Sequence, residues 1–385
     1  MAVAGPARAV AALAALAAAG LSGCTSPSPQ ASHAGSTATT PARRSAPPSY
    51  GASSRPASAF PLLPARGPGH LARGSDPRAL PGDVLIADED NRRLLLVDPY
   101  GRIRWLFPQP GIPGRGQVLG LPDDAFFSAD GRSIVATQEM SETISVIDIA
   151  TGRITRQYGH PGVPGSRPGY FSHPDDAMLL PDGEVLAADI RNCRIVLLSS
   201  RRITRQFGSA SACSHEPPRQ FALPNGAFPL RDGHFLITEI LGDWVDEMSL
   251  DGHLQWSAHP PGVSYPSDAN EVSPGRYVVA DYSYPGQVVI FSRTGHVVWR
   301  FRPSGAAALN HPSLAMPLPN GNILVNDDYN DRVIVISRKT DRIIWQYGHD
   351  GVRGSAAGYL DNPDGVDLAP PYSLLMTRTA TTGRR

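Results

Sequence analysis

The sequence predicts an all-β fold built from six copies of one four-stranded unit. The main observation is a Pro-led motif that recurs six times, as in LPDDAFFSADG (121–131) and HPDDAMLLPDG (173–183). Its prolines are 52, 50, 42, 46 and 51 residues apart, at Pro122, Pro174, Pro224, Pro266, Pro312 and Pro363. A period of this size, with several short strands per unit, is typical of a six-bladed β-propeller.

Each unit reads as four antiparallel strands in a constant order. The Pro-led motif is the first strand, and a Gly turn leads to a second strand that ends in a polar residue. Predicted second strands include 84–88, 185–189, 277–281 and 323–327. Predicted third strands include 93–98, 194–199 and 332–337. The fourth strand carries a tryptophan in four units, which we expect to pack on the outside of the blade: Trp105, Trp256, Trp299 and Trp345.

The last unit is incomplete, and this predicts how the ring closes. YGHDGVRGSAAGYLDNPDGVDLAP (347–370) repeats the segment 158–183 and stops after its first strand. We expect that strand to join the unit that begins at Asp83, which leaves no open radial edge for pairing with other chains. The propeller is therefore expected to span 80–375 as a monomer, followed by a disordered tail at 376–385.

The N-terminal residues predict export and lipidation. AVAALAALAAAGL (9–21) is apolar but too short to span a bilayer, as the core of a signal peptide is. LSGC (21–24) resembles the lipobox of bacterial lipoproteins, whose lipidated cysteine would correspond to Cys24. We therefore expect a signal peptide at 1–23 and an extracytoplasmic protein anchored to the membrane by lipid. The alternative is a plain secretory signal with an incidental cysteine.

Residues 24–79 are rich in Ser, Pro, Ala and Thr. A segment of this composition cannot bury enough apolar surface to offset the entropy of ordering. We expect a flexible tether that holds the folded domain clear of the membrane.

The overall charge restricts the partners. The chain has 35 Lys and Arg against 35 Asp and Glu, for a net charge of zero with neutral histidines. Without a basic excess there is no electrostatic reason to expect nucleic-acid binding.

The repeats resemble the NHL-repeat family of six-bladed propellers. The likeness is clearest at 158–199, where Tyr-Gly, a Gly-rich link, Pro-x-Asp, Asp-Gly and Ala-Asp-x-x-Asn-x-Arg-Ile follow in order. Gln138 and Glu239 depart from the pattern, because they replace the Asp that ends the second strand. Gly-x-x-x-Trp turns, as at 252–256 and 295–299, more weakly resemble quinoprotein-type (PQQ-like) repeats. Neither likeness supplies a ligand, because fold does not imply function.

The direction of the strands sorts the loops onto two faces. The Pro-led corners, the loops between second and third strands and the long links emerge on one face. The opposite face holds tight Asp-Gly and Asn-Gly turns, which serve hairpin geometry. We expect the first, loop-rich face to bind the ligand.

A ring of acids is expected where the first strands begin on this face. Its members are Asp123, Asp124, Asp175, Asp176, Asp268 and Asp364. Such a ring at a channel mouth can hold a hard cation such as Ca²⁺ through oxygen ligands. Alternatively, each acid caps backbone N–H groups of its own turn.

Two histidines occupy equivalent corners three blades apart. His173 and His311 each precede a motif proline, and with Asp176 they suggest a Zn²⁺ site. This arrangement resembles peptidyl-hydroxyglycine amidating lyases, NHL-type propellers that use histidines and zinc. The alternative is a histidine stacked on the proline that follows it.

The acids that end the second strands recur too regularly for a local active site. They are Asp88, Asp189, Glu239, Asp281 and Asp327. Three of them are followed by an Asn and an Arg at fixed spacing, and we expect these side chains to fix the same loop in each blade.

Two cysteines remain after Cys24. Cys193 enters a third strand from the loop-rich face, and Cys213 lies in a long link on that face. An extracytoplasmic compartment permits disulfides, so we expect these two residues to be bonded.

Two functions are compatible with the sequence. The first is a binding or scaffold module for a protein, peptide or glycan, without a required cofactor. The second is a metal-assisted lyase or hydrolase with its site at the channel mouth. We find no Ser-His-Asp order, His-Glu-x-x-His motif or Walker-type loop for the enzyme, so the binding module is favoured.

Overall fold

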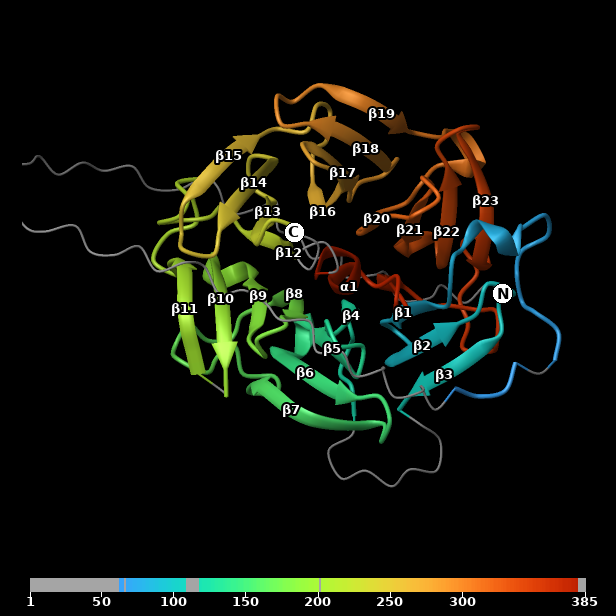
Figure 1. Cartoon of the computed structure of the whole chain (residues 1–385), viewed down its shortest axis with the longest axis horizontal. Helices are drawn as coiled ribbons and strands as arrows, with labels where there is room; N and C mark the ends of the chain where they lie inside the picture. Colours follow the sequence, from blue (N-terminus) through green and yellow to red (C-terminus); the bar gives the residue numbers. More distant parts are fainter. Residues whose placement is uncertain (1–61, 66, 109–117, 201, 380–385) are drawn as a thin grey trace, which may run out of the picture. The chain divides into compact units, whose positions relative to one another are not determined.

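Six four-stranded sheets form the blades of a closed ring (Figure 1). The computed structural model describes residues 62–65, 67–108, 118–200 and 202–379. The predicted all-β, six-bladed propeller is therefore confirmed. The expected signal peptide at 1–23, the lipidation site Cys24 and the tether up to residue 61 lie outside the described residues.

Each blade contains four antiparallel strands, ordered from the axis outward. Blade 1 contains β24 (Pro363–Leu368), β1 (Val84–Asp88), β2 (Arg93–Val97) and β3 (Ile103–Phe107). Blade 2 contains β4 (Ala125–Phe127), β5 (Ser133–Gln138), β6 (Thr143–Asp148) and β7 (Arg153–Gly159). Blade 3 contains β8 (Pro174–Leu179), β9 (Val185–Asp189), β10 (Arg194–Ser199) and β11 (Arg202–Gly208).

The second half of the ring follows the same plan. Blade 4 contains β12 (Pro224–Pro229), β13 (His234–Glu239), β14 (Trp244–Ser249) and β15 (Leu254–Ala258). Blade 5 contains β16 (Pro266–Ser273), β17 (Arg276–Asp281), β18 (Gln287–Ser292) and β19 (Val297–Phe301). Blade 6 contains β20 (Ala315–Pro317), β21 (Ile323–Asp327), β22 (Arg332–Ser337) and β23 (Arg342–Gly348).

The ring closes as predicted, by pairing the end of the chain with its first blade. β24 lies antiparallel to β1, with Val84 opposite Leu368. First strands of neighbouring blades also contact one another and so line the axis. This arrangement brings the starts of the six Pro-led motifs together on one face.

The ordered structure extends beyond the expected 80–375. Leu71 forms a bridge to Tyr347, and η1 (Pro77–Ala79) follows before the first blade. At the other end, α1 (Leu374–Thr379) lies at the centre of the ring in Figure 1. The Leu374 N–H donates to the Asp367 carboxylate at 2.9 Å, which holds α1 at the face opposite the Pro-led corners. No helix in the described part of the chain is long and apolar enough to cross a membrane.

Apolar side chains fill the spaces between blades. The second strands are buried along their whole length in β1 and β9, as expected for sheets covered on both faces. Trp105 and Trp345, on the outer strands, are 2% and 0% exposed. The predicted packing role of these tryptophans is confirmed, whereas Trp256 and Trp299 are only partly buried.

The strand-end acids fix the loop-rich corners, as expected. Asp189 accepts hydrogen bonds from Asn192, from Arg194 and from the Ser172 N–H, at 2.8, 2.7 and 2.7 Å. Asn192 also donates to the Gly165 carbonyl in the link before the blade. The same arrangement recurs in Asp88 with Asn91 and Arg93, and in Asp327 with Asn330 and Arg332.

Candidate functional site

The acids predicted at the loop-rich face converge on the axis. We call them the axial acid cluster: Asp123, Asp124, Asp175, Asp176, Asp268 and Asp364. Carboxylate oxygens of Asp123, Asp124 and Asp175 lie within 4.8 Å of one another, as do those of Asp124, Asp176 and Asp268. These five side chains are at most 7% exposed, and Asp364 is partly exposed. The structure therefore joins five acids of the predicted ring in these two groups, and Asp364 lies near enough to Asp123 for the two carboxyls to affect each other's pKa.

The register of the first strands explains why these carboxyls face the axis. In blades 3, 4 and 5 a β-bulge lies between the motif proline and the alanine three residues later. The two residues between them leave the ladder. In blade 4 the second of these residues is Gly226, and the equivalent residue in blade 1 is Gly365. A Cβ on Gly226 would lie 2.9 Å from Oδ1 of Asp268. A Cβ on Gly365 would clash with Asp124. The glycines leave the space that neighbouring carboxyls occupy.

The cluster holds more hydrogen-bond acceptors than donors. Burial raises the pKa of each of its carboxyls, to about 6 for Asp364, and neighbouring acids add to the rise at most of them. The Oδ1 atoms of Asp124, Asp176 and Asp268 are buried and have no hydrogen-bond partner in the described structure. Unsatisfied buried oxygens of this kind favour a bound cation or proton.

A rim of residues that the sequence analysis did not identify surrounds the cluster. It consists of the residue directly after each second strand: Glu89, Glu139, Ile190, Ile240, Tyr282 and Asp328. Burial and nearby acids, Asp364 among them, raise the pKa of Glu89 to about 9 and of Glu139 to about 8. The signal was present in the repeat, because each rim residue follows the strand-end residue by one position.

Aromatic rings lie beside the acids. The ring centroids of Tyr265 and Tyr282 are 5.2 Å apart, and those of His311 and Tyr329 are 4.5 Å apart. Burial, and then nearby carboxyls, raise the pKa of Tyr265 and of Tyr282 well above the usual range. A cavity of about 410 Å³ on this side is lined by Tyr284, Gly305, Ala306, Ala308, Asn310, His311 and Asn330.

The predicted zinc ligands do not come together. The His173 N–H donates to the Glu142 carboxylate at 2.7 Å, and burial lowers the pKa of His173 to about 4. His311 instead packs between Tyr282 and Tyr329. Among the described residues, no group of three converging ligand atoms contains either histidine, whereas Asp176 belongs to the acid cluster. Because the two corners are three blades apart, the two imidazoles lie on opposite sides of the axis.

The long link before blade 4 is held covalently. Cys193 and Cys213 form a disulfide with a Cα–Cα distance of 5.4 Å, so the predicted bond is confirmed. It ties the link to the start of β10 on the loop-rich face.

Known proteins resemble this chain in its repeats and its fold. Residues 243–363 match a family model described as outer membrane protein assembly factor BamB, which is built on PQQ-like repeats. The matched region contains the Gly-x-x-x-Trp turns at 252–256 and 295–299. The chain is thus a propeller with PQQ-like repeats over that region. None of the curated proteins matches the chain.

Solved structures support the fold alone. A protein of unknown function from Bacteroides caccae is 16% identical with a TM-score of 0.52, over 74% of this chain and 98% of that chain. A nidogen/laminin complex gives 12% identity and a TM-score of 0.52 over the same shares. A streptogramin B lyase structure is 16% identical over 80% of this chain and 91% of that chain, with a TM-score of 0.49.

Proposed function

We propose that the protein is a membrane-anchored, extracytoplasmic NHL-like propeller lipoprotein that acts as a monomeric binding module. Its loop-rich face binds a cationic group of a peptide or protein at the mouth of the axial acid cluster. The observation that carries the proposal is the convergence of five acids, three of which keep a buried oxygen without a donor. A positive charge brought by the ligand would offset this excess of acceptors.

The rim offers direct contacts for such a ligand. Glu139 and Asp364 are partly exposed, so they can meet a lysine or arginine side chain that enters from solvent. Tyr265 and Tyr282 lie beside them, and aromatic faces add cation–π attraction of roughly 0.5–2 kcal/mol. Burial raises the pKa of the buried acids and of Glu139, so a cation at the mouth favours their charged forms, and the negative charge develops as the ligand binds.

The ligand proposal is tested by fluorescence anisotropy with a labelled lysine-rich hexapeptide and a glutamate-rich one. The lysine peptide should bind more tightly, and added salt should weaken the binding. Glu139→Gln should weaken it about tenfold, because one charge-assisted contact is lost. Asp182→Asn, in a turn on the opposite face, is the matched control. Equal binding of both peptides, or no effect of Glu139→Gln, would refute the proposal.

The anchor is tested separately through Cys24. Two or more acyl chains on this residue would hold the protein stably in a membrane. Cys24→Ala should move the expressed protein from the detergent phase to the aqueous phase in a partitioning experiment. Equal partitioning of the two proteins would mean that Cys24 is not lipidated.

The second candidate function is a metal-assisted lyase or hydrolase at the same mouth. It is favoured by the unsatisfied oxygens of Asp124, Asp176 and Asp268, which suit a hard cation such as Ca²⁺. Elemental analysis of the full chain, purified without added metal, separates the two candidates. A stoichiometric metal that Asp176→Asn removes would favour the enzyme, and a metal-free protein would count against it.

A further inference from the structure

The corner of blade 4 differs from the other strand-end corners. Its strand-end acid is Glu239, and Trp244 pairs with it across the ladder. Arg194 in blade 3 and Arg332 in blade 6 hold that position. A second acid, Asp246, follows two residues later on β14. The corner therefore has two acids and lacks the arginine that neutralises the acid in blades 1, 3 and 6.

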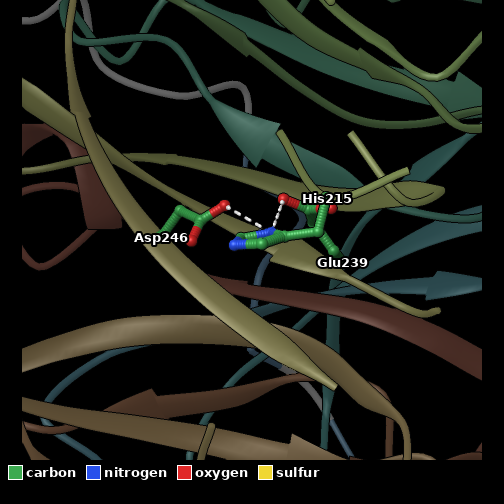
Figure 2. A group of neighbouring side chains, drawn as sticks. All are labelled: His215, Glu239 and Asp246. Carbon is green, nitrogen blue, oxygen red and sulfur yellow. Dashed lines mark hydrogen bonds and ion pairs between the residues drawn. The ribbon is translucent and has the colours of Figure 1, made fainter. Parts of the chain in front are cut away.

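His215 reaches these acids from the link before blade 4 (Figure 2). Its Nδ1 lies 3.0 Å from a carboxylate oxygen of Glu239 and 3.8 Å from one of Asp246. The three ligand atoms all lie within 4.8 Å of one another. Both acids have fully buried side chains, whereas that of His215 is 21% exposed. The imidazole is therefore the member of the group that solvent reaches.

Asp246 independently points to a ligand. Both of its carboxylate oxygens are buried and have no hydrogen-bond partner in the described part of the chain. An unsatisfied buried polar group costs roughly 1–3 kcal/mol. The Asp246 side chain cannot easily move into solvent, because β14 is paired with β13 on one side and with β15 on the other. A bound cation would remove that cost.

Other contacts hold the three side chains in place. The Ala222 N–H donates to the second carboxylate oxygen of Glu239. The ring of His215 stacks on Trp244, with centroids 3.9 Å apart and planes at 4°. The disulfide of Cys213 fixes the chain two residues before the histidine. Ligands that are held before an ion arrives bind it more tightly.

We propose that His215, Glu239 and Asp246 bind a divalent transition-metal ion of the Zn²⁺ type. One imidazole nitrogen with two carboxylate oxygens suits such an ion, whereas Ca²⁺ takes oxygen ligands. Zn²⁺ bonds of about 2.0–2.2 Å in a tetrahedral site place ligand atoms about 3.4 Å apart. The observed separations of 3.0 and 3.8 Å bracket that value. Two carboxylates also balance the charge of the ion, and three protein ligands would leave the fourth position of a tetrahedral ion for water.

A second group, at the other end of β13, has similar composition but different chemistry. Asp232, His234 and Glu247 also bring three ligand atoms within 4.8 Å. Glu247, however, accepts hydrogen bonds from four side chains: His234, Trp256, Tyr277 and Arg293. Because its carboxylate is already satisfied, this second group has no comparable need for an ion. It supplies a matched control.

The test is calorimetric titration of ZnCl₂ into the chelator-treated full-length protein. We expect one Zn²⁺ per chain. His215→Ala and Asp246→Asn should each weaken binding by more than about 100-fold, beyond the loss that outer contacts cause. His234→Ala should leave the affinity unchanged. Visible absorption of bound Co²⁺ should appear in the wild type and vanish in the two site variants.

Two controls show whether each variant is folded and whether Zn²⁺ binding depends on the peptide site. Asp246→Asn preserves shape, and circular dichroism and the melting temperature report whether each variant is folded. Glu139→Gln, which tests the peptide site, should not change Zn²⁺ binding, so the two proposals fail independently. Absence of stoichiometric Zn²⁺ binding by the wild type, or binding that survives in folded His215→Ala and Asp246→Asn, would overturn the assignment.

Discussion

The corners of blades 3 and 4 occupy the same repeat position but are neutralised differently. In blade 3, Arg194 contacts Asp189 at 2.7 Å, and both side chains are buried. In blade 4, Glu239 meets Asp246 and His215 instead. Burial raises the pKa of Asp189, and Arg194 opposes the rise. Burial also raises the pKa of Glu239, to about 10, and Asp246 adds to it.

The replacement of the arginine in blade 4 also changes how the link before the blade is held. In blade 3 the link is held through Asn192 and Arg194, which donate to its backbone carbonyls. Gly242 and Trp244 stand at those positions in blade 4: glycine has no side-chain donor, and the indole has one N–H in place of the five of a guanidinium. There the disulfide holds the link. Loss of the internal cation thus coincides with a covalent tie and with an acid, Asp246, whose carboxylate oxygens have no hydrogen-bond partner in the described structure.

The largest expected effect comes from removing the cation in blade 3. Arg194→Met leaves Asp189 buried without its partner, and breaking a buried pair in this way costs about 3–5 kcal/mol. Urea unfolding followed by circular dichroism measures the loss. Arg202→Ala, at an exposed site on β11, should change stability by less than about 0.5 kcal/mol. A loss below about 1 kcal/mol in Arg194→Met would show that the pair does not hold the corner.

A smaller effect is expected from the covalent tie in blade 4. The disulfide closes a loop with a sequence separation of 20, for which removal costs about 3 kcal/mol. The double variant Cys193→Ser, Cys213→Ser should therefore unfold at lower urea concentration than the wild type. Reducing the wild type should reproduce the effect, whereas unchanged unfolding would mean that other contacts hold the link.

The smallest expected effect is on the pH dependence of the free energy of unfolding, which differs between the two corners. In the metal-free protein, Glu239 keeps its proton between pH 6.5 and 8, because its folded pKa is about 10, whereas the unfolded chain has lost it. The folded state then binds more protons, so stability falls as pH rises, by about 1.4 kcal/mol per pH unit for one proton.

Glu239→Gln should remove the contribution of one proton to this slope, about 1.4 kcal/mol per pH unit. Urea unfolding at pH 6.5, 7.25 and 8 measures it, and Glu184→Gln, at a partly exposed site beside a turn, is the control. An unchanged slope would place the pKa of Glu239 below this range.

Much of the fold could be predicted because the repeat records strand geometry directly. The Pro-led motif and the strand-end acid locate the ends of strands, so the acids from Asp123 to Asp364 could be assigned to one face. The zinc prediction was weaker, since equivalent corners such as those of His173 and His311 lie on opposite sides of the axis.

His215 could not be identified from the repeat. It lies in a link whose path depends on a disulfide and on stacking with Trp244, neither of which follows a strand period. Glu239 was grouped with the structural strand-end acids, which is right for Asp88 and Asp189. The signal against that grouping was Trp244 at the position of the repeated arginine.

The pairing of β24 with β1 also has a consequence for timing. Val84 meets Leu368, its partner 284 residues later in the chain, so blade 1 cannot be completed until almost the whole propeller has been synthesised. Contacts between such distant residues form slowly. Until then β1 presents an unpaired edge, which can template pairing with other chains. A nascent or proteolysed chain without β24 is therefore most exposed to aggregation at its first strand.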